Sequence, residues 1–312
     1  MTERLFATDA FTFFGIFAAL AFLIGLSYGL YRGESAADVF YRAWEAATMS
    51  ILGGFLARSF VGIALFLADD SPGAILAVSW GFLLWPGVVE SAARLVGEPL
   101  LQPAHLLWLA AAVGSFVGMA DGLYQVHKCS GPIPFTFLID VTWGLAGSTN
   151  GALFHIANFI WGGHEQDGRK SGHRYKSGFR FKSGFAVTQG SVMSNMGGHG
   201  PGSSLYKHEM VHVLQNRLFG PLFPLTYLGW MAVWLLPAFL AGLIAKGYTI
   251  GEAIQGWCYF NNPWEVWAYK VGGYRNINAA VLWSTTTAVI FAVLFFLPVL
   301  GLAIWAAAAV WG

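Results

Sequence analysis

The residues best suited to chemistry lie in one short motif, His208-Glu209-x-x-His212. Ser203 can cap a helix ahead of it, and no Gly or Pro interrupts the chain before Gly220. On such a helix the two histidines are one turn apart and converge on one face, so they can give a metal ion two nitrogen ligands. Glu209 lies beside them, where it can reach a metal-bound water rather than the metal.

This arrangement predicts a zinc site with hydrolytic chemistry. Zinc lowers the pKa of its water to about 7, and Glu209 would take the proton as the water attacks a carbonyl group. The alternative is a pair of structural histidines in a buried helix. The position of the motif favours zinc, because it lies in the only polar insert of an apolar chain and directly follows a Gly-rich loop at 197–202.

A catalytic zinc needs a third protein ligand and an open fourth position. Glu265 is the strongest candidate, because Pro263 suits the first turn of a helix and would place Glu265 near its start. Glu252 is the only other acidic residue after the motif and lies between glycine-flanked stretches. His199 and His173 could serve instead, with His199 ranked second. Glu265 could also be a carboxylate that only stabilises a helix start or lies at headgroup level.

The pair of motifs His208-Glu209-x-x-His212 and Glu265-x-x-Ala268 resembles the gluzincin pattern of HtpX-type and CAAX-prenyl-protease-type membrane metallopeptidases. The longer stretch 134–275 resembles a group of uncharacterised bacterial integral membrane proteins. The resemblance implies Zn²⁺ held by His208, His212 and Glu265, with Glu209 as general base. It also implies location in the bacterial cytoplasmic (inner) membrane.

The chain departs from the peptidase pattern in two ways. The aspartate that follows Ala268 in the peptidases is Tyr269 here, so a histidine ligand must take its support from another residue, such as Gln215 or Asn216. HtpX-like enzymes also place two membrane helices between the motifs, whereas this chain has one apolar run of about the length of a single span, at 222–245.

The composition indicates an integral membrane protein. Of the 312 residues, 56% are apolar and only 11% are charged, whereas an ordinary soluble domain has about 25% charged residues. This excludes a soluble enzyme and a disordered chain. The net charge of +1 gives no field that attracts polyanions, so nucleic acid is not an expected partner. The two cysteines lie far apart, which excludes a disulfide framework.

The hydropathy pattern predicts an all-α polytopic membrane protein with about 6–7 apolar segments, a small β-containing polar insert and the H-E-x-x-H helix. We expect an N-terminal bundle of five spans at 1–163, the insert at 164–220, a linking segment with the Glu265 helix at 221–278, and a C-terminal segment at 279–312. The apolar segments are 11–30, 47–68, 74–94, 104–124, 135–161, 222–245 and 279–311.

Five ionisable side chains fall inside these segments. At membrane depth such groups usually face the protein interior and pair with one another. They indicate either a proton or ion path or a few structural ion pairs, and the second interpretation is favoured because they show no regular spacing between segments. They are Arg58, Glu90, Arg94, Asp121 and Asp140.

The insert carries a strand-like pattern from 174 to 188, in which aromatic and basic residues alternate. The sequence Lys-Ser-Gly-Phe occurs twice, at 176–179 and 182–185. We expect strands with one apolar and one cationic face, and the cationic face could contact anionic lipid headgroups or be solvated. The following loop at 197–202 is expected to be mobile.

If Glu265 meets the two histidines, the chain between them must cross the membrane an even number of times. The run 222–245 is too short for two crossings, so it is expected to form a re-entrant hairpin that breaks near Pro237. A single straight spanning helix over this run would remove Glu265 from the site.

The leading hypothesis is a membrane-embedded zinc metallopeptidase that cleaves a peptide or membrane-protein substrate near the surface of the lipid bilayer. The rival is a non-catalytic subunit of a larger membrane complex, with a structural or vestigial metal site. A catalytic zinc would keep a water in the fourth position, whereas a structural one would be closed by a side chain such as His199. A third option is hydrolysis of a lipid or another non-peptide substrate.

Overall fold

The computed structural model describes residues 8–127, 133–165, 171–181, 183–273 and 283–311. The chain is mostly helical with a small mixed sheet, as expected. Within these residues four helices are long and apolar enough to cross a membrane, so the prediction of 6–7 apolar spans is too high. They are α2 (Thr8–Tyr31), α3 (Ala36–Leu67), α6 (Pro103–Tyr124) and α10 (Leu222–Ile244).

The predicted segment 74–94 is not one span. It folds as α4 (Pro72–Val78), the π-helix η1 (Ser79–Leu83) and α5 (Trp85–Leu95). The chain reverses at Leu84, which has a φ of 59°, and Pro86 starts the new helix. Gly87 then packs so closely on Trp80 that no larger residue fits there without a shift.

The predicted segment 135–161 is also divided, into α7 (Ile133–Asp140) and α8 (Leu145–Trp161). The break follows Asp140, whose buried carboxylate accepts two hydrogen bonds from Arg217, at 2.9 and 2.6 Å. This ion pair ties the turn to the H-E-x-x-H helix, and neither fragment reaches the length of a span.

The C-terminal apolar run forms α13 (Thr285–Trp311), which continues through Pro298. Residues 279–282 of the predicted segment lie outside the described residues. The part from Thr286 to Gly301 is among the apolar helices shorter than a span.

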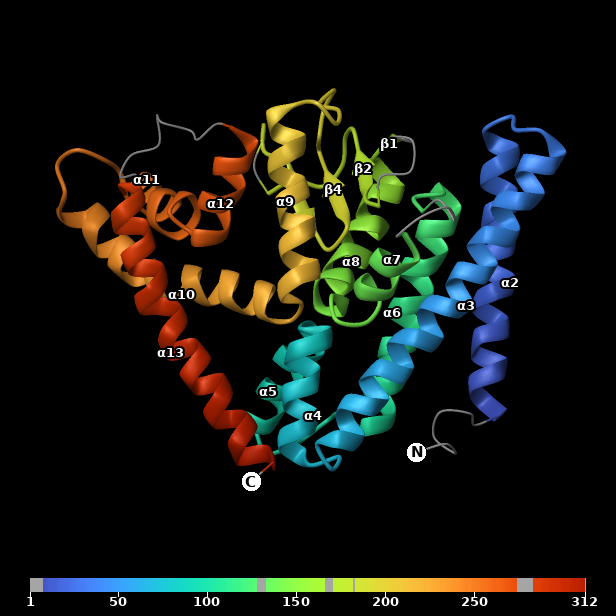
Figure 1. Cartoon of the computed structure of the whole chain (residues 1–312), viewed down its shortest axis with the longest axis horizontal. Helices are drawn as coiled ribbons and strands as arrows, with labels where there is room; N and C mark the ends of the chain where they lie inside the picture. Colours follow the sequence, from blue (N-terminus) through green and yellow to red (C-terminus); the bar gives the residue numbers. More distant parts are fainter. Residues whose placement is uncertain (1–7, 128–132, 166–170, 182, 274–282, 312) are drawn as a thin grey trace.

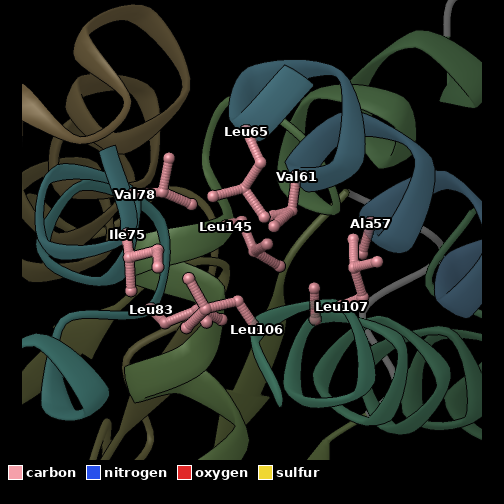
Figure 2. Packing of buried hydrophobic residues seen from close by; sticks show 10 residues of the cluster. Ala57, Val61, Leu65, Ile75, Val78, Leu83, Leu106, Leu107 and Leu145 are labelled. Atoms are coloured by element: carbon pink, nitrogen blue, oxygen red, sulfur yellow. The ribbon is translucent and has the colours of Figure 1, made fainter. Parts of the chain in front are cut away.

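Helices α2, α3 and α6 pack together along one side of the molecule (Figure 1). Small residues allow α3 and α6 to approach closely, because a Cβ at Gly53 would overlap the carbonyl oxygen of Gly114. Beside this contact a core cluster joins the two helices to α4, η1 and α8, as Figure 2 shows. It contains Ala57, Val61, Leu65, Ile75, Val78, Leu83, Leu106, Leu107, Ala110 and Leu145.

The polar insert contains a four-stranded sheet in the order β1-β2-β4-β3, with β2 and β4 parallel and the other pairs antiparallel. The predicted strands over 174–188 form only at the ends of that stretch, because β2 ends at Tyr175 and β3 begins at Val187. Of the predicted cationic face, Arg174 is instead buried and pairs with Glu165 at 2.7 Å, and Lys182 lies outside the described residues. The strands are β1 (His164–Glu165), β2 (His173–Tyr175), β3 (Val187–Gln189) and β4 (Val192–Ser194).

Helix α10 is continuous through Pro237, so the predicted break near this residue is wrong. The chain leaves the end of α9 (Ser204–Phe219), runs outward along α10 and then returns beside it through α11 (Ile250–Ile254) and the π-helix η2 (Gln255–Phe260) (Figure 1). The return ends in α12 (Pro263–Gly272), which packs against α9. A single helix over 222–245 therefore does not separate Glu265 from the histidines, contrary to expectation.

The close contact between α3 and α6 gives a first test. Gly53→Ala should destabilise the protein by about 1–3 kcal/mol, because its methyl group would push the two helices apart. Gly15→Ala on α2 is the matched control, since no atom lies within 4 Å of a Cβ at Gly15. Thermal unfolding in detergent should show an apparent Tm several degrees lower for the first variant only. Equal Tm values for both variants would contradict this account of the packing.

Candidate metal centre

Two helices carry the predicted site, and local sequence explains where each begins. Helix α9 starts at its cap Ser203, whose hydroxyl accepts a hydrogen bond from the Tyr206 amide at 3.1 Å. Helix α12 starts at Asn262, whose side chain accepts from the Trp264 amide at 3.2 Å, with Pro263 in the first turn. These starts place His208 and His212 on one face of α9, opposite Glu265 in the first turn of α12.

The structure brings His208, His212 and Glu265 together. The two Nε2 atoms are 3.2 Å apart, and the Glu265 carboxylate oxygens lie 3.2 Å from Nε2 of His208 and 3.3 Å from Nε2 of His212. Ligand atoms about 2.0–2.1 Å from a tetrahedral zinc would be separated by about 3.3 Å. All three side chains are buried, and together they could hold a metal ion.

Gln215 orients one of the ligands. Its amide nitrogen donates to the Trp264 carbonyl at 3.0 Å, so its oxygen must face Nδ1 of His212, 2.8 Å away. His212 therefore carries a proton on Nδ1, and its Nε2 points toward His208 and Glu265, where a metal ion would replace the second proton. Gln215 was one of the two residues proposed from the sequence to replace the missing aspartate.

Two tyrosines complete the surroundings. The hydroxyl of Tyr227 on α10 donates to Glu265 Oε1 at 2.7 Å. The ring of Tyr269, which stands where the peptidases have aspartate, packs against His208 with a centroid separation of 4.4 Å. Tyr269 thus contributes a ring contact to this histidine.

The electrostatics of the site favour a cation beside Glu265. In the absence of a metal ion, burial alone would lower the pKa of His212, but the charge and hydrogen bond of Glu265 outweigh it and raise this pKa to about 9. Burial would raise the pKa of Glu265, but the two histidines hold it well below its usual value. The carboxylate is therefore ionised at neutral pH and faces a proton that a metal ion could replace.

Glu209 does not belong to the three-residue ligand group. It is buried, and its Oε2 accepts a hydrogen bond from the Thr188 hydroxyl of β3 at 2.7 Å. The strand thus fixes the carboxylate beside the metal centre. Neither Thr188 nor Tyr227 was identified from the sequence, because a threonine in a strand and a tyrosine in an apolar run carry no motif.

The other candidate ligands lie elsewhere. His199 is exposed, and its carbonyl oxygen accepts from Arg174. His173 binds Asp121 at 2.7 Å, and Glu252 caps the start of α11. Within the described residues neither histidine joins the group, so the proposed closure of the site by His199 is not found.

Comparisons with protein-family models, with curated proteins and with solved structures find no match to this chain.

The raised pKa of His212 predicts how metal binding depends on pH. Below about pH 9 the metal must displace a proton, so the apparent zinc affinity should rise about tenfold per pH unit between pH 7 and 8.5. Competition with a zinc-buffering chelator in detergent would measure this slope. In Glu265→Gln the carboxylate that raises the pKa is lost, so affinity should be lower and the slope shallower. A flat profile in the wild type would contradict the proposed proton competition.

The contact of Gln215 with His212 gives a second prediction for the site. Gln215→Leu removes the acceptor for Nδ1 and should weaken zinc binding by about 10–100-fold. Gln215→Glu keeps an acceptor at the same position and should retain more of the affinity. Isothermal titration of both variants would check this order, and equal affinity in Gln215→Leu and wild type would exclude the orienting role.

Proposed function

We propose that the chain is a membrane-embedded zinc metallopeptidase that hydrolyses peptide bonds close to the membrane surface. His208, His212 and Glu265 would hold the zinc, and Glu209 would act as general base. The observation that carries this proposal is the convergence of the three buried side chains that could bind a metal ion. Glu209 lies beside them and accepts a hydrogen bond from Thr188 instead of joining the group.

The donor set fits a catalytic zinc better than most other cations. Two imidazoles and one carboxylate are the ligands of a large class of hydrolytic zinc sites, and three protein ligands leave one position for water or substrate. When bound, zinc supplies Lewis acidity and a water of lowered pKa. The spacing of the ligand atoms supports this choice, because the two Nε2 atoms are 3.2 Å apart and each lies within 3.3 Å of one Glu265 oxygen, close enough to share one ion.

The protein's own residues would divide the remaining work. Glu209 would accept a proton from the nucleophilic water and deliver it to the leaving amine. The Thr188 hydroxyl holds this carboxylate in place, and Tyr227 fixes the orientation of Glu265. Burial of the whole site lowers the local dielectric, which strengthens each of these interactions.

A membrane setting is supported by the helices around the site. Helix α10 begins directly after α9 and is long and apolar enough to span a membrane. A scissile bond at this site would thus lie close to the bilayer, as expected for a peptide segment of a membrane-protein substrate. The bacterial cytoplasmic membrane is the proposed location.

The decisive variant is Glu209→Gln. The variant should still bind about one zinc per chain, because the ligands are kept. Its rate of peptide hydrolysis should fall by about 10²–10⁴-fold, because the general base is removed. Zinc content by elemental analysis and cleavage of a quenched fluorescent peptide library in proteoliposomes would be measured together. His212→Ala is the control and should lose both zinc and activity. Unchanged cleavage by Glu209→Gln would exclude this mechanism.

A second candidate, a structural zinc site in a non-catalytic membrane subunit, is favoured by the burial of the ligands. Glu265 and His208 are each 2% exposed and His212 is 6% exposed. In that case His212→Ala would again lose zinc, but the wild-type protein would cleave no peptide. Removal of the metal would lower the Tm of the protein and would change no rate of peptide hydrolysis.

A further inference from the structure

A second group of ionisable side chains is buried outside the metal centre. It consists of Asp121 near the end of α6, His127 just beyond that helix, His164 of β1 and His173 of β2, which we call the histidine chain. Asp121, His127 and His173 are 2%, 7% and 0% exposed, and His164 is half-buried. None of the four belongs to the metal centre, and the metallopeptidase mechanism does not use them.

The four side chains form one continuous series of close contacts. Nε2 of His127 lies 3.2 Å from Asp121 Oδ2, and Asp121 Oδ1 lies 2.7 Å from Nε2 of His173. The other nitrogen of His173, Nδ1, lies 3.1 Å from Nε2 of His164. Each inner member therefore uses both of its polar atoms, one toward each neighbour.

This connectivity is what proton transfer requires. A carboxylate can accept a proton from one neighbour and pass it to the other after the group turns, and a neutral imidazole can accept a proton on one nitrogen while releasing one from the other. Chains of aspartate and histidine buried beside membrane helices are typical of proton relays. We propose that the histidine chain is a proton relay, which moves a single exchangeable proton between His164 at its half-buried end and His127 inside the protein.

The transfer balances without any further reactant. His164, protonated on both nitrogens, gives its Nε2 proton to Nδ1 of His173, and the Nε2 proton of His173 passes to Asp121 Oδ1. The carboxyl group then reorients so that its protonated oxygen faces His127, and Nε2 of His127 takes this proton. One N–H bond of His164 is broken and one N–H bond of His127 is formed. Asp121 ends deprotonated, as it began, whereas His173 ends with its proton on Nδ1 and must return it to Nε2 before the next transfer.

The surroundings of the two ends favour this direction. At the outer end, burial and the neighbouring charges of His173, His155, Arg174 and Arg32 lower the pKa of His164 well below its usual value. Tyr124 of α6 stacks on this ring at 3.6 Å and keeps it in place. His164 therefore holds a proton less tightly than an ordinary histidine does.

At the inner end the surroundings favour the protonated form of His127. Burial and the charge of Arg217 oppose a proton on His127, but the charges of Asp121 and Asp140 outweigh them and raise its pKa. The ring of Phe137 on α7 packs against His127 with a centroid separation of 5.7 Å. The chain thus runs from a weak proton acceptor at the half-buried end to a strong one inside.

The test measures two quantities: the rate at which the imidazole protons exchange with solvent, and the pKa of His127. His164→Phe keeps a ring to stack on Tyr124 but removes both nitrogens. In ¹⁵N-histidine-labelled protein in nanodiscs, exchange of the His127 and His173 imidazole protons with solvent should slow at least tenfold in this variant. The pKa of His127, read from its ¹⁵N shifts, should remain above its usual value, which also shows that the cluster is still folded.

The exposed His199, changed to Phe, is the matched control and should alter neither quantity. Asp121→Asn should lower the pKa of His127, because it removes the carboxylate that stabilises the imidazolium. Unchanged exchange in His164→Phe, or equal slowing in His199→Phe, would overturn the relay and leave a static ion pair. Zinc content and peptide cleavage are not read in this experiment, so its result is independent of the proposed peptidase function.

Discussion

The buried carboxylate of Glu265 is the group on which the arrangement of the C-terminal half depends. An ionised carboxylate removed from water is costly unless positive charge and hydrogen-bond donors surround it. Here the imidazoles of His208 and His212 lie 3.2 and 3.3 Å away, and Tyr227 donates to one oxygen. Because these partners come from α9 and α10 while the acid comes from α12, satisfying the carboxylate fixes three helices relative to one another.

The return of the chain along α10 is what makes this possible, and aromatic packing stabilises it. The indole of Trp230 donates to the Trp257 carbonyl at 3.1 Å, and Trp234 packs against Trp257 and Trp283 with centroid separations of 5.6 and 4.9 Å. Such ring pairs contribute beyond their buried area. The helical hairpin of α10 with α11 and η2 therefore brings α12 back to α9.

The convergence of His208, His212 and Glu265 could be predicted from the sequence better than the fold around it. The candidate ligands follow from a motif with fixed helical spacing and from the scarcity of acids after it, and the structure brings these residues together. The support from Gln215 could be anticipated because it lies one turn beyond His212. Thr188 and Tyr227 could not, since their roles depend on strand and helix packing that no local pattern encodes.

The errors in the fold have a common physical cause. Hydropathy measures only apolar content, so it does not distinguish a spanning helix from two shorter helices that are buried against protein. The run 74–94 reverses at Leu84, and 135–161 breaks after Asp140, whose ion pair with Arg217 is a tertiary contact. The alternation over 174–188 predicted strands that form only at the ends of this stretch. Of its basic side chains, Arg174 pairs with Glu165 inside the protein, whereas Lys176 and Arg180 are exposed.

The pairing of the ionisable groups in the apolar segments separates structural charges from functional ones. Glu90 with Arg94 and Asp140 with Arg217 are simple ion pairs, at 2.7 and 2.6 Å, each with one acid and one permanent cation. Asp121 differs, because both of its partners are histidines, whose ring nitrogens can accept and release protons. A buried acid that needs only a stable counter-ion is better served by arginine, which stays protonated. The choice of two histidines for Asp121 therefore favours a group that exchanges protons over one that only neutralises charge.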